Sequence, residues 1–261
     1  MVTNKYKISK EYSDLLEGDK KENIDLNRYS ISKLLKPTRV AVLSETEDPI
    51  EDVSDHFPAF LGKAVHFYLQ NHVYGVNEWK LVVPLGEYTI VGIVDRYDPD
   101  TATIIDYKLR KTSKEDISEA VQQIKCYAWM LRKEGIYAQK GKVVHIYKDW
   151  SKLKNQTQSP IEEFEFPIYS DDIEEAEKWI KSRISAIEQG RKTLPMCTDE
   201  EKWKGDDKWA VYKTEYDEKA KRVYDTEEEA LATGLIVKRR PGRCLKCECF
   251  CPYSKVCKIK P

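Results

Sequence analysis

Apolar and polar positions alternate most clearly in the middle of the chain, where the pattern predicts a β-hairpin centred on residues 92–108. The first apolar run extends from Tyr88 to Val94, and a second follows after Asp98-Pro99-Asp100. Aspartate and proline between two runs rich in β-branched residues are typical of a turn that joins two strands.

Acidic and basic side chains interrupt the two apolar runs. Alternation in the second strand places Ile104, Asp106 and Lys108 on one face, and Ile105, Tyr107 and Leu109 on the other. Asp95, at the end of the first run, should lie opposite them or one diagonal step away. Charges inside apolar strands are costly unless they are paired or bind a metal. The alternative is an exposed hairpin on which Asp106 and Lys108 form a surface pair.

The remaining pattern predicts an α/β core with a mixed sheet. Apolar residues at helical spacing predict helices at residues 59–74, 114–133 and 170–189. Further strands are predicted at residues 78–84, 142–148 and 163–168, and the first of these pairs with the strand at residues 87–94 that leads into the central hairpin. A shorter helix is expected within residues 24–43, with Ser30 or Ser32 as its cap and Pro37 as its stop.

Two of the long helices carry polar residues of interest. In the helix over residues 59–74, the expected core stripe consists of Leu61, Ala64, Val65 and Tyr68. His66 sits beside this stripe, and a lone histidine there is more often structural than a metal ligand. In the helix over residues 114–133, Gln123 and Tyr127 are four positions apart and share one face. Taken alone, such a pair is ordinary at the edge of an apolar core.

The character of the chain changes after Gly190. Residues 209–213 and 221–224 predict a hairpin, and Thr226 with Glu229 is a capping box for a short helix. The last thirty residues hold eight lysines and arginines against one glutamate. We therefore expect a flexible arm at residues 1–22, a core domain at residues 23–190 and a small cysteine-rich subdomain at residues 191–261.

Composition limits the classes of protein. The net charge of −1 gives no global signal for nucleic acid, and no apolar run approaches the length that spans a membrane. The first 21 residues are polar and of mixed charge, unlike a signal peptide. Seven cysteines, five of them in the last eighteen residues, do not resemble a secreted disulfide framework. A reducing cytosol is the expected compartment.

The hairpin suggests metal chemistry. Two carboxylates at the separation expected for Asp95 and Asp106 can share a hard divalent cation, which prefers oxygen ligands. Beside them, the ammonium group of Lys108 can orient a water molecule or neutralise developing negative charge.

Four short motifs in one order resemble those of the PD-(D/E)XK nuclease superfamily. They are His66 in a helix, Gly92-Ile-Val-Asp95, Asp106-Tyr-Lys108 and Gln123-Ile-Lys-Cys-Tyr127. Each motif is weak alone, but four in register are specific. The likeness is closest to the RecB-like branch, which includes phage-type exonucleases, AddB-type helicase-nucleases and CRISPR-adaptation nucleases. It implies a restriction-endonuclease-like core, a mixed central sheet flanked by helices.

The resemblance also implies roles for individual residues. Asp95, Asp106, the backbone carbonyl of Tyr107 and His66 would bind Mg²⁺ or Mn²⁺, and Lys108 would position the attacking water. Gln123 and Tyr127 would support the site. A glutamate is sometimes a further ligand in such sites, and the sequence does not choose between Glu78 and Glu87.

The cysteines resemble the iron–sulfur site found in part of this branch. The best match for a [4Fe–4S] cluster is Cys197, Cys247, Cys251 and Cys257, with Cys244 or Cys249 as alternates for Cys247. Four thiolates suit a structural zinc ion equally well. A third interpretation is a set of free thiols in a basic tail.

Together these features predict a metal-dependent DNA nuclease, expected to be an exonuclease on single strands or duplex ends in recombination or repair. The residues expected to contact the DNA backbone are Lys111, Lys114, Arg239, Arg240 and Arg243. The alternative is a catalytically silent DNA-end-binding or recombination-partner protein that keeps the fold. The expected partners are DNA and a recombination or single-strand-binding protein, in the cytoplasm of a prokaryotic or phage-infected cell.

Overall fold

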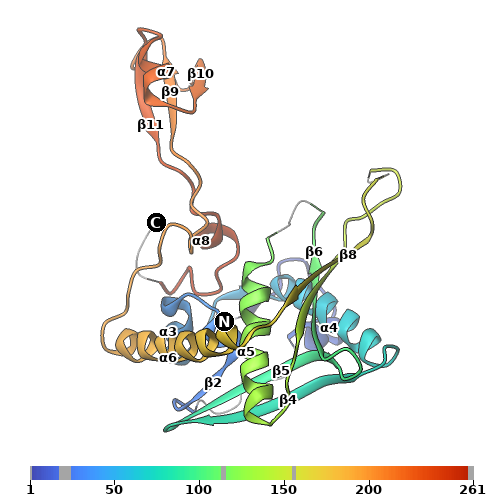
Figure 1. Cartoon of the computed structure of the whole chain (residues 1–261). Coiled ribbons are helices and arrows are strands. Elements are labelled where there is room, and N and C mark those ends of the chain that lie inside the picture. The colour runs from blue at the N-terminus through green and yellow to red at the C-terminus, as the bar shows by residue number, and fades with distance from the viewer. Residues whose placement is uncertain (1, 18–24, 113–115, 155–156, 258–261) are drawn as a thin grey trace. The chain divides into compact units, whose positions relative to one another are not determined.

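A computed structural model of the chain describes residues 2–17, 25–112, 116–154 and 157–257 (Figure 1). The chain forms two compact units. The sheet unit comprises Met1–Thr46 and Glu51–Leu194, and the cysteine unit comprises Glu47–Ile50 and Pro195–Pro261.

The sheet unit confirms the predicted fold class, a mixed central sheet flanked by helices. Its strands are β1 (Val2–Thr3), β2 (Arg28–Ser30), β3 (Glu51–Asp52), β4 (Val76–Leu85), β5 (Tyr88–Asp98), β6 (Thr103–Arg110), β7 (Lys140–Tyr147) and β8 (Ile161–Pro167). Its helices are α1 (Lys10–Glu17), α2 (Ile31–Leu34), α3 (Thr38–Thr46), the 3₁₀ helix η1 (Val53–His56), α4 (Phe57–Gln70), α5 (Ser118–Lys133) and α6 (Ser170–Lys192).

The central sheet is built around β5. This strand pairs antiparallel with β4 and β6 and parallel with β2, while β6 pairs parallel with β7, and β7 antiparallel with β8. The pairing of β5 with β6 is short, because it runs only from Asp98↔Thr103 to Arg96↔Ile105. The two strands thus stop pairing just before Asp95 and Asp106, and β2 pairs with residues 89–91 of β5.

The faces of the sheet follow the predicted alternation in β6. Ile104 belongs to the main core, whereas Ile105 and Tyr107 belong to a small cluster with Val144 and Leu69. Helix α5 contacts β4, β5, β6 and β7 on the main-core side, and α6 packs against α5 and α3. Eight residues of α5 are buried, so this helix is the centre of the core.

The predicted core stripe of α4 is wrong. No residue of α4 is buried, and Tyr68 is 63% exposed. The helix touches the sheet instead through Leu69, which packs against the Ile105 cluster. Apolar residues occur on nearly every side of α4, so helical spacing alone did not identify the side that faces the protein.

Two helices begin within residues 24–43, where the sequence predicted one. Ser30 caps α2 by accepting a hydrogen bond from the Lys33 backbone N–H, but α2 ends before Pro37 and α3 begins just after it. Within the expected arm, β1 pairs with β3, and the Asp52 carboxylate accepts hydrogen bonds from Thr3 and from the Lys5 backbone.

The cysteine unit contains β9 (Lys208–Tyr212), β10 (Arg222–Tyr224), α7 (Glu227–Leu231), β11 (Ile236–Arg240) and α8 (Leu245–Cys249). The predicted hairpin is the pair β9 and β10, and β11 adds a third antiparallel strand that the sequence pattern missed. Thr226 caps α7 as predicted, by accepting a hydrogen bond from the Glu229 backbone N–H. None of the helices in the described residues is long and apolar enough to cross a membrane.

Candidate active site

Three side chains from α4, β4 and β5 converge near the place where β5 and β6 stop pairing. His66, Glu78 and Asp95 each offer a ligand atom, and these atoms all lie within 4.8 Å of one another. The Nδ1 atom of His66 is 3.1 Å from Glu78 Oε1 and 3.7 Å from Asp95 Oδ1. One imidazole and two carboxylates therefore face one small volume.

The β4–β5 hairpin brings Glu78 and Asp95 together. Asn77 pairs with Arg96 and Trp79 with Val94, so Glu78 stands opposite Asp95 in this register. Glu78 has a positive φ of 49°, a conformation that costs free energy for a side chain of this size. Strained backbone at such a position is common at functional sites.

Asp95 lies where the regular alternation of β5 breaks. Val94 and Tyr97 are both buried in the main core although they are three positions apart. Strict alternation would have sent Tyr97 to the opposite face, so the strand is irregular at Asp95 and Arg96. Asp95 Oδ2 accepts a hydrogen bond from the Tyr107 backbone N–H at 2.9 Å, which ties it to β6.

A second polar group extends from β6 to α5. The Lys108 ammonium donates to Asp106 Oδ1 at 2.9 Å and to Gln123 Oε1 at 3.0 Å. The Gln123 amide donates in turn to the Tyr127 hydroxyl at 2.7 Å. The four-residue spacing predicted for Gln123 and Tyr127 thus lines them up with the lysine.

A glycine makes room for this arrangement. A Cβ atom on Gly92 would lie 2.8 Å from Tyr127 Cε1 and 2.9 Å from Met130 Sδ, closer than real Cβ contacts. Because Gly92 has no side chain, α5 can lie close to β5 and hold Tyr127 over the strand.

The two aspartates are electrostatically strained. Burial, followed by repulsion from Asp106, raises the pKa of Asp95 to about 7. Burial also raises the pKa of Asp106, which is 1% exposed, although Lys108 opposes this shift. A cation bound between the two carboxylates would relieve both effects.

The donor atoms fit a hard divalent cation. Among the described residues, Asp106 Oδ2 is buried without a hydrogen-bond partner, because the Lys108 ammonium lies 2.8 Å away but out of alignment for a hydrogen bond. A buried anionic oxygen of this kind suits a metal ligand. Carboxylates with one imidazole are a donor set for Mg²⁺ or Mn²⁺.

Counting along the hairpin could have found Glu78. Leu85 pairs with Tyr88 around the turn, so each step back along β4 matches one step forward along β5 and reaches Glu78 opposite Asp95. Glu87 lies in the turn itself, away from the converging group. The structure therefore distinguishes the two glutamates that the sequence left open.

The residues predicted to contact DNA differ in their surroundings. Lys111 follows β6 in an exposed position, and Lys114 lies outside the described residues. Arg239 is paired with Asp207, Arg243 with Glu248, and Arg240 donates to the Tyr212 hydroxyl at 2.8 Å. Arg239 and Arg243 are thus each paired with a carboxylate within the cysteine unit, whereas the partner of Arg240 is an uncharged hydroxyl.

Cys244, Cys251 and Cys257 lie near Cys247 of α8. Burial raises the pKa of the Cys247 thiol, and its neighbours Cys244, Cys251 and Cys257 raise it further. Cys244 is buried, whereas Cys249 is exposed. Within the described residues, no three cysteine sulfurs lie within 4.8 Å of one another, so the choice of four ligands stays a prediction.

Comparison with known proteins agrees with the motifs. A family model described as the PD-(D/E)XK nuclease superfamily matches residues 58–258, which include every side chain of the candidate site. No relative was found among curated proteins.

Three solved structures are similar to this chain at low identity. SSO0001 is 20% identical with a TM-score of 0.47, over 67% of this chain and 82% of that one. LHK-Exo in complex with dAMP is 14% identical with a TM-score of 0.36, over 63% and 93% of the chains. A phage related exonuclease from Haemophilus somnus 129PT is 16% identical with a TM-score of 0.32, over 52% and 69%.

Proposed function

This chain belongs to the PD-(D/E)XK nuclease superfamily, and we propose that it is a metal-dependent DNA nuclease. We further propose that it acts as an exonuclease on single-stranded DNA or duplex ends in recombination or repair. The observation that carries the proposal is the convergence of His66, Glu78 and Asp95 beside the Asp106–Lys108 pair. Such a set matches the needs of phosphodiester hydrolysis.

In this proposal the cation is Mg²⁺ or Mn²⁺, held by His66, Glu78, Asp95, Asp106 and the carbonyl of Tyr107. When bound, it polarises the phosphate and lowers the pKa of water. The Tyr107 N–H holds Asp95 in place, and this contact leaves Asp95 Oδ1 directed toward His66.

Lys108 has a separate role. Its ammonium, fixed between Asp106 and Gln123, orients the attacking water and faces the negative charge that develops on the phosphate. Gln123 acts through Lys108, and Tyr127 acts through Gln123, so both are positioning residues.

The test is degradation of linear DNA with Mn²⁺ by the wild type and by Lys108→Ala. We expect the substitution to abolish hydrolysis while leaving the circular dichroism spectrum unchanged. Lys181→Ala, which removes an exposed helix ion pair on α6, is the matched control and should retain full activity.

If the wild type and Lys108→Ala are equally inert, the nuclease proposal is wrong, and the chain is a catalytically silent DNA-end-binding protein. If the wild type is active, comparing circular with linear substrates, both single-stranded and duplex, separates an exonuclease from an endonuclease. Persistent cleavage of circular single strands would contradict the exonuclease part of the proposal.

For the cysteine unit we propose a [4Fe–4S] cluster held by Cys197, Cys247, Cys251 and Cys257, with Cys244 or Cys249 in place of Cys247 as the alternative. Thiolate ligands of this number suit such a cluster. Anaerobically purified protein should be brown and contain iron and sulfide. Colourless protein with stoichiometric zinc would replace the cluster with a structural zinc ion.

A further inference from the structure

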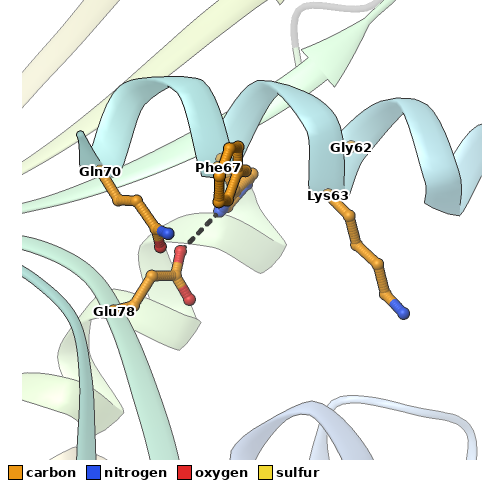
Figure 2. Close-up of a pocket in the computed structure, with 6 residues that line it drawn as sticks. Gly62, Lys63, Phe67, Gln70 and Glu78 are labelled. Carbon is orange, nitrogen blue, oxygen red and sulfur yellow. Dashed lines mark hydrogen bonds and ion pairs between the residues drawn. The ribbon is translucent and has the colours of Figure 1, made fainter. Parts of the chain in front are cut away.

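A pocket on α4 adjoins the candidate metal group. It has a volume of about 410 Å³ and is lined by Gly62, Lys63, His66, Phe67, Gln70 and Glu78 (Figure 2). His66 and Glu78 belong to both the pocket and the converging group. The other four residues have no part in the proposed hydrolysis, so their presence requires a separate explanation.

Three of these side chains are open to a ligand. The Phe67 ring is 67% exposed, and Figure 2 shows Lys63 and Gln70 extending from α4 toward the side on which Glu78 lies. In the described part of the chain, neither the Lys63 ammonium nor the Gln70 amide makes an ion pair or a side-chain hydrogen bond. A Cβ on Gly62 would meet nothing within 4 Å, so this part of the wall is unfilled.

An aromatic ring, a lysine and an amide beside a metal site match one nucleotide. A base stacks on an exposed ring, and a lysine binds the phosphate next to it. The volume is within the range of pockets that hold small ligands. An internal base of a duplex already stacks on both faces and is paired at its edge, so Phe67 can accept an unpaired base or the outer face of a terminal pair, and the Gln70 amide favours the unpaired base, whose edge is free.

Resting on the proposed nuclease function, we propose that this pocket binds an unpaired nucleotide next to the cleaved phosphate. Phe67 stacks on the base, Lys63 contacts the neighbouring phosphate, and Gln70 offers its amide to the base edge. The pocket thereby selects single-stranded DNA at the active site. The shared residues His66 and Glu78 set the distance between the bound base and the metal group.

Binding is tested in the Lys108→Ala background, which leaves the DNA intact. The probe is fluorescent oligothymidylate, compared with an abasic oligonucleotide of the same length. Phe67→Ala should weaken binding of oligothymidylate by about tenfold, the effect of one lost stacking contact, and should leave abasic binding unchanged. Phe67→Trp should restore it. Tyr68→Ala is the matched control, because Tyr68 is 63% exposed at the next position but does not line the pocket.

The outcomes separate the two proposals. If the wild type cleaves DNA but Phe67→Ala binds oligothymidylate normally, the pocket proposal is wrong and the nuclease proposal stands. If the wild type is inert but binding depends on Phe67, the pocket proposal stands without the nuclease. Equal weakening for oligothymidylate, abasic oligonucleotide and duplex, or equal weakening by Tyr68→Ala, would overturn base stacking at Phe67.

Discussion

The sheet unit and the cysteine unit differ in the size of their apolar cores, and therefore in what can hold their polar groups in place. In the sheet unit, a continuous apolar core including Trp129, Ile124 and Ile180 fixes the strands and α5, and these elements then bring the acids together. In the described part of the cysteine unit, the buried apolar side chains are few, among them Ala210, Val211 and Ala230.

Because the two cores differ in size, we expect a metal ion to have a different role in each unit. In the sheet unit the apolar core already fixes the strands, so the cation proposed there would serve chemistry and relieve the repulsion between Asp95 and Asp106. A unit with so small a core usually needs staples such as metal–thiolate bonds. The cysteines are thus expected to stabilise the fold, and the acids to support catalysis.

The largest expected effect is on the fold of the cysteine unit. Cys251→Ser should remove one ligand and unfold this unit locally, because a structural metal can supply on the order of 10 kcal/mol of folding free energy. Limited proteolysis should then cut within residues 195–257 and leave the sheet unit intact. Equal protease resistance of the variant and the wild type would show that the cysteines have no structural role.

The next largest effect is on the reaction. Asp106→Asn should lower the rate of DNA hydrolysis by about 10³-fold, a loss typical of removing a key electrostatic group. It should also raise the melting temperature without metal, because a buried charge is removed. Asp225→Asn, which removes an exposed ion pair with Lys208 in the cysteine unit, is the control and should leave the turnover rate unchanged. If Asp106→Asn instead lowered the melting temperature, the charged Asp106 carboxylate would not destabilise the folded protein, and this explanation would be wrong.

The sequence pattern predicted the hairpin because turn residues and two apolar runs specify local pairing. The alternation around Asp106 and Lys108 was confirmed, since β6 is regular there. The spacing of Gln123 and Tyr127 on α5 was also informative, because a helix keeps residues four apart on one face. Local rules sufficed where the backbone is regular.

Elsewhere, tertiary packing decided the result. Which side of α4 meets the sheet depends on the packing of Leu69 against Ile105 and Tyr107. These residues are far apart in the sequence, so no local pattern predicts their contact. The irregularity at Asp95 and the positive φ of Glu78 are departures from regular strand geometry that the sequence did not announce. Pairing of Arg239 with Asp207 likewise depends on the folded cysteine unit.

A third prediction concerns pH and metal in the sheet unit. The folded-state pKa of Asp95, about 7, exceeds its unfolded value near 3.8. The resulting stability is therefore present below about pH 4 and is lost as the pH rises through 7, a change of a few kcal/mol. Without metal, the melting temperature should fall between pH 5 and pH 8. In thermal denaturation, Mn²⁺ should raise the melting temperature more at pH 8 than at pH 5. Asp95→Asn should weaken both the dependence on pH and the dependence on Mn²⁺.

A smaller effect is expected from the close packing behind the site. Gly92→Ala should destabilise the protein by about 1–3 kcal/mol through overpacking and reduce activity by displacing Tyr127. Gly62→Ala is the matched control: its Cβ meets nothing, so it should stabilise α4 by about 0.5–1 kcal/mol. Urea denaturation of both variants provides the measurement. Equal effects would mean that the approach of Tyr127 to β5 does not depend on glycine.

The smallest effect concerns the basic residues of the two units. Lys111 is exposed next to β6, and the described residues offer it no ion pair. Lys111→Ala should therefore lower the slope of log affinity against log salt by about 1. Arg239→Ala should change the slope less, because Asp207 already neutralises its charge, and Asp207→Ala should steepen it by freeing Arg239. Fluorescence anisotropy across a salt series decides the point. If Arg239→Ala lowered the slope more than Lys111→Ala did, we would conclude that the main DNA contact lies in the cysteine unit.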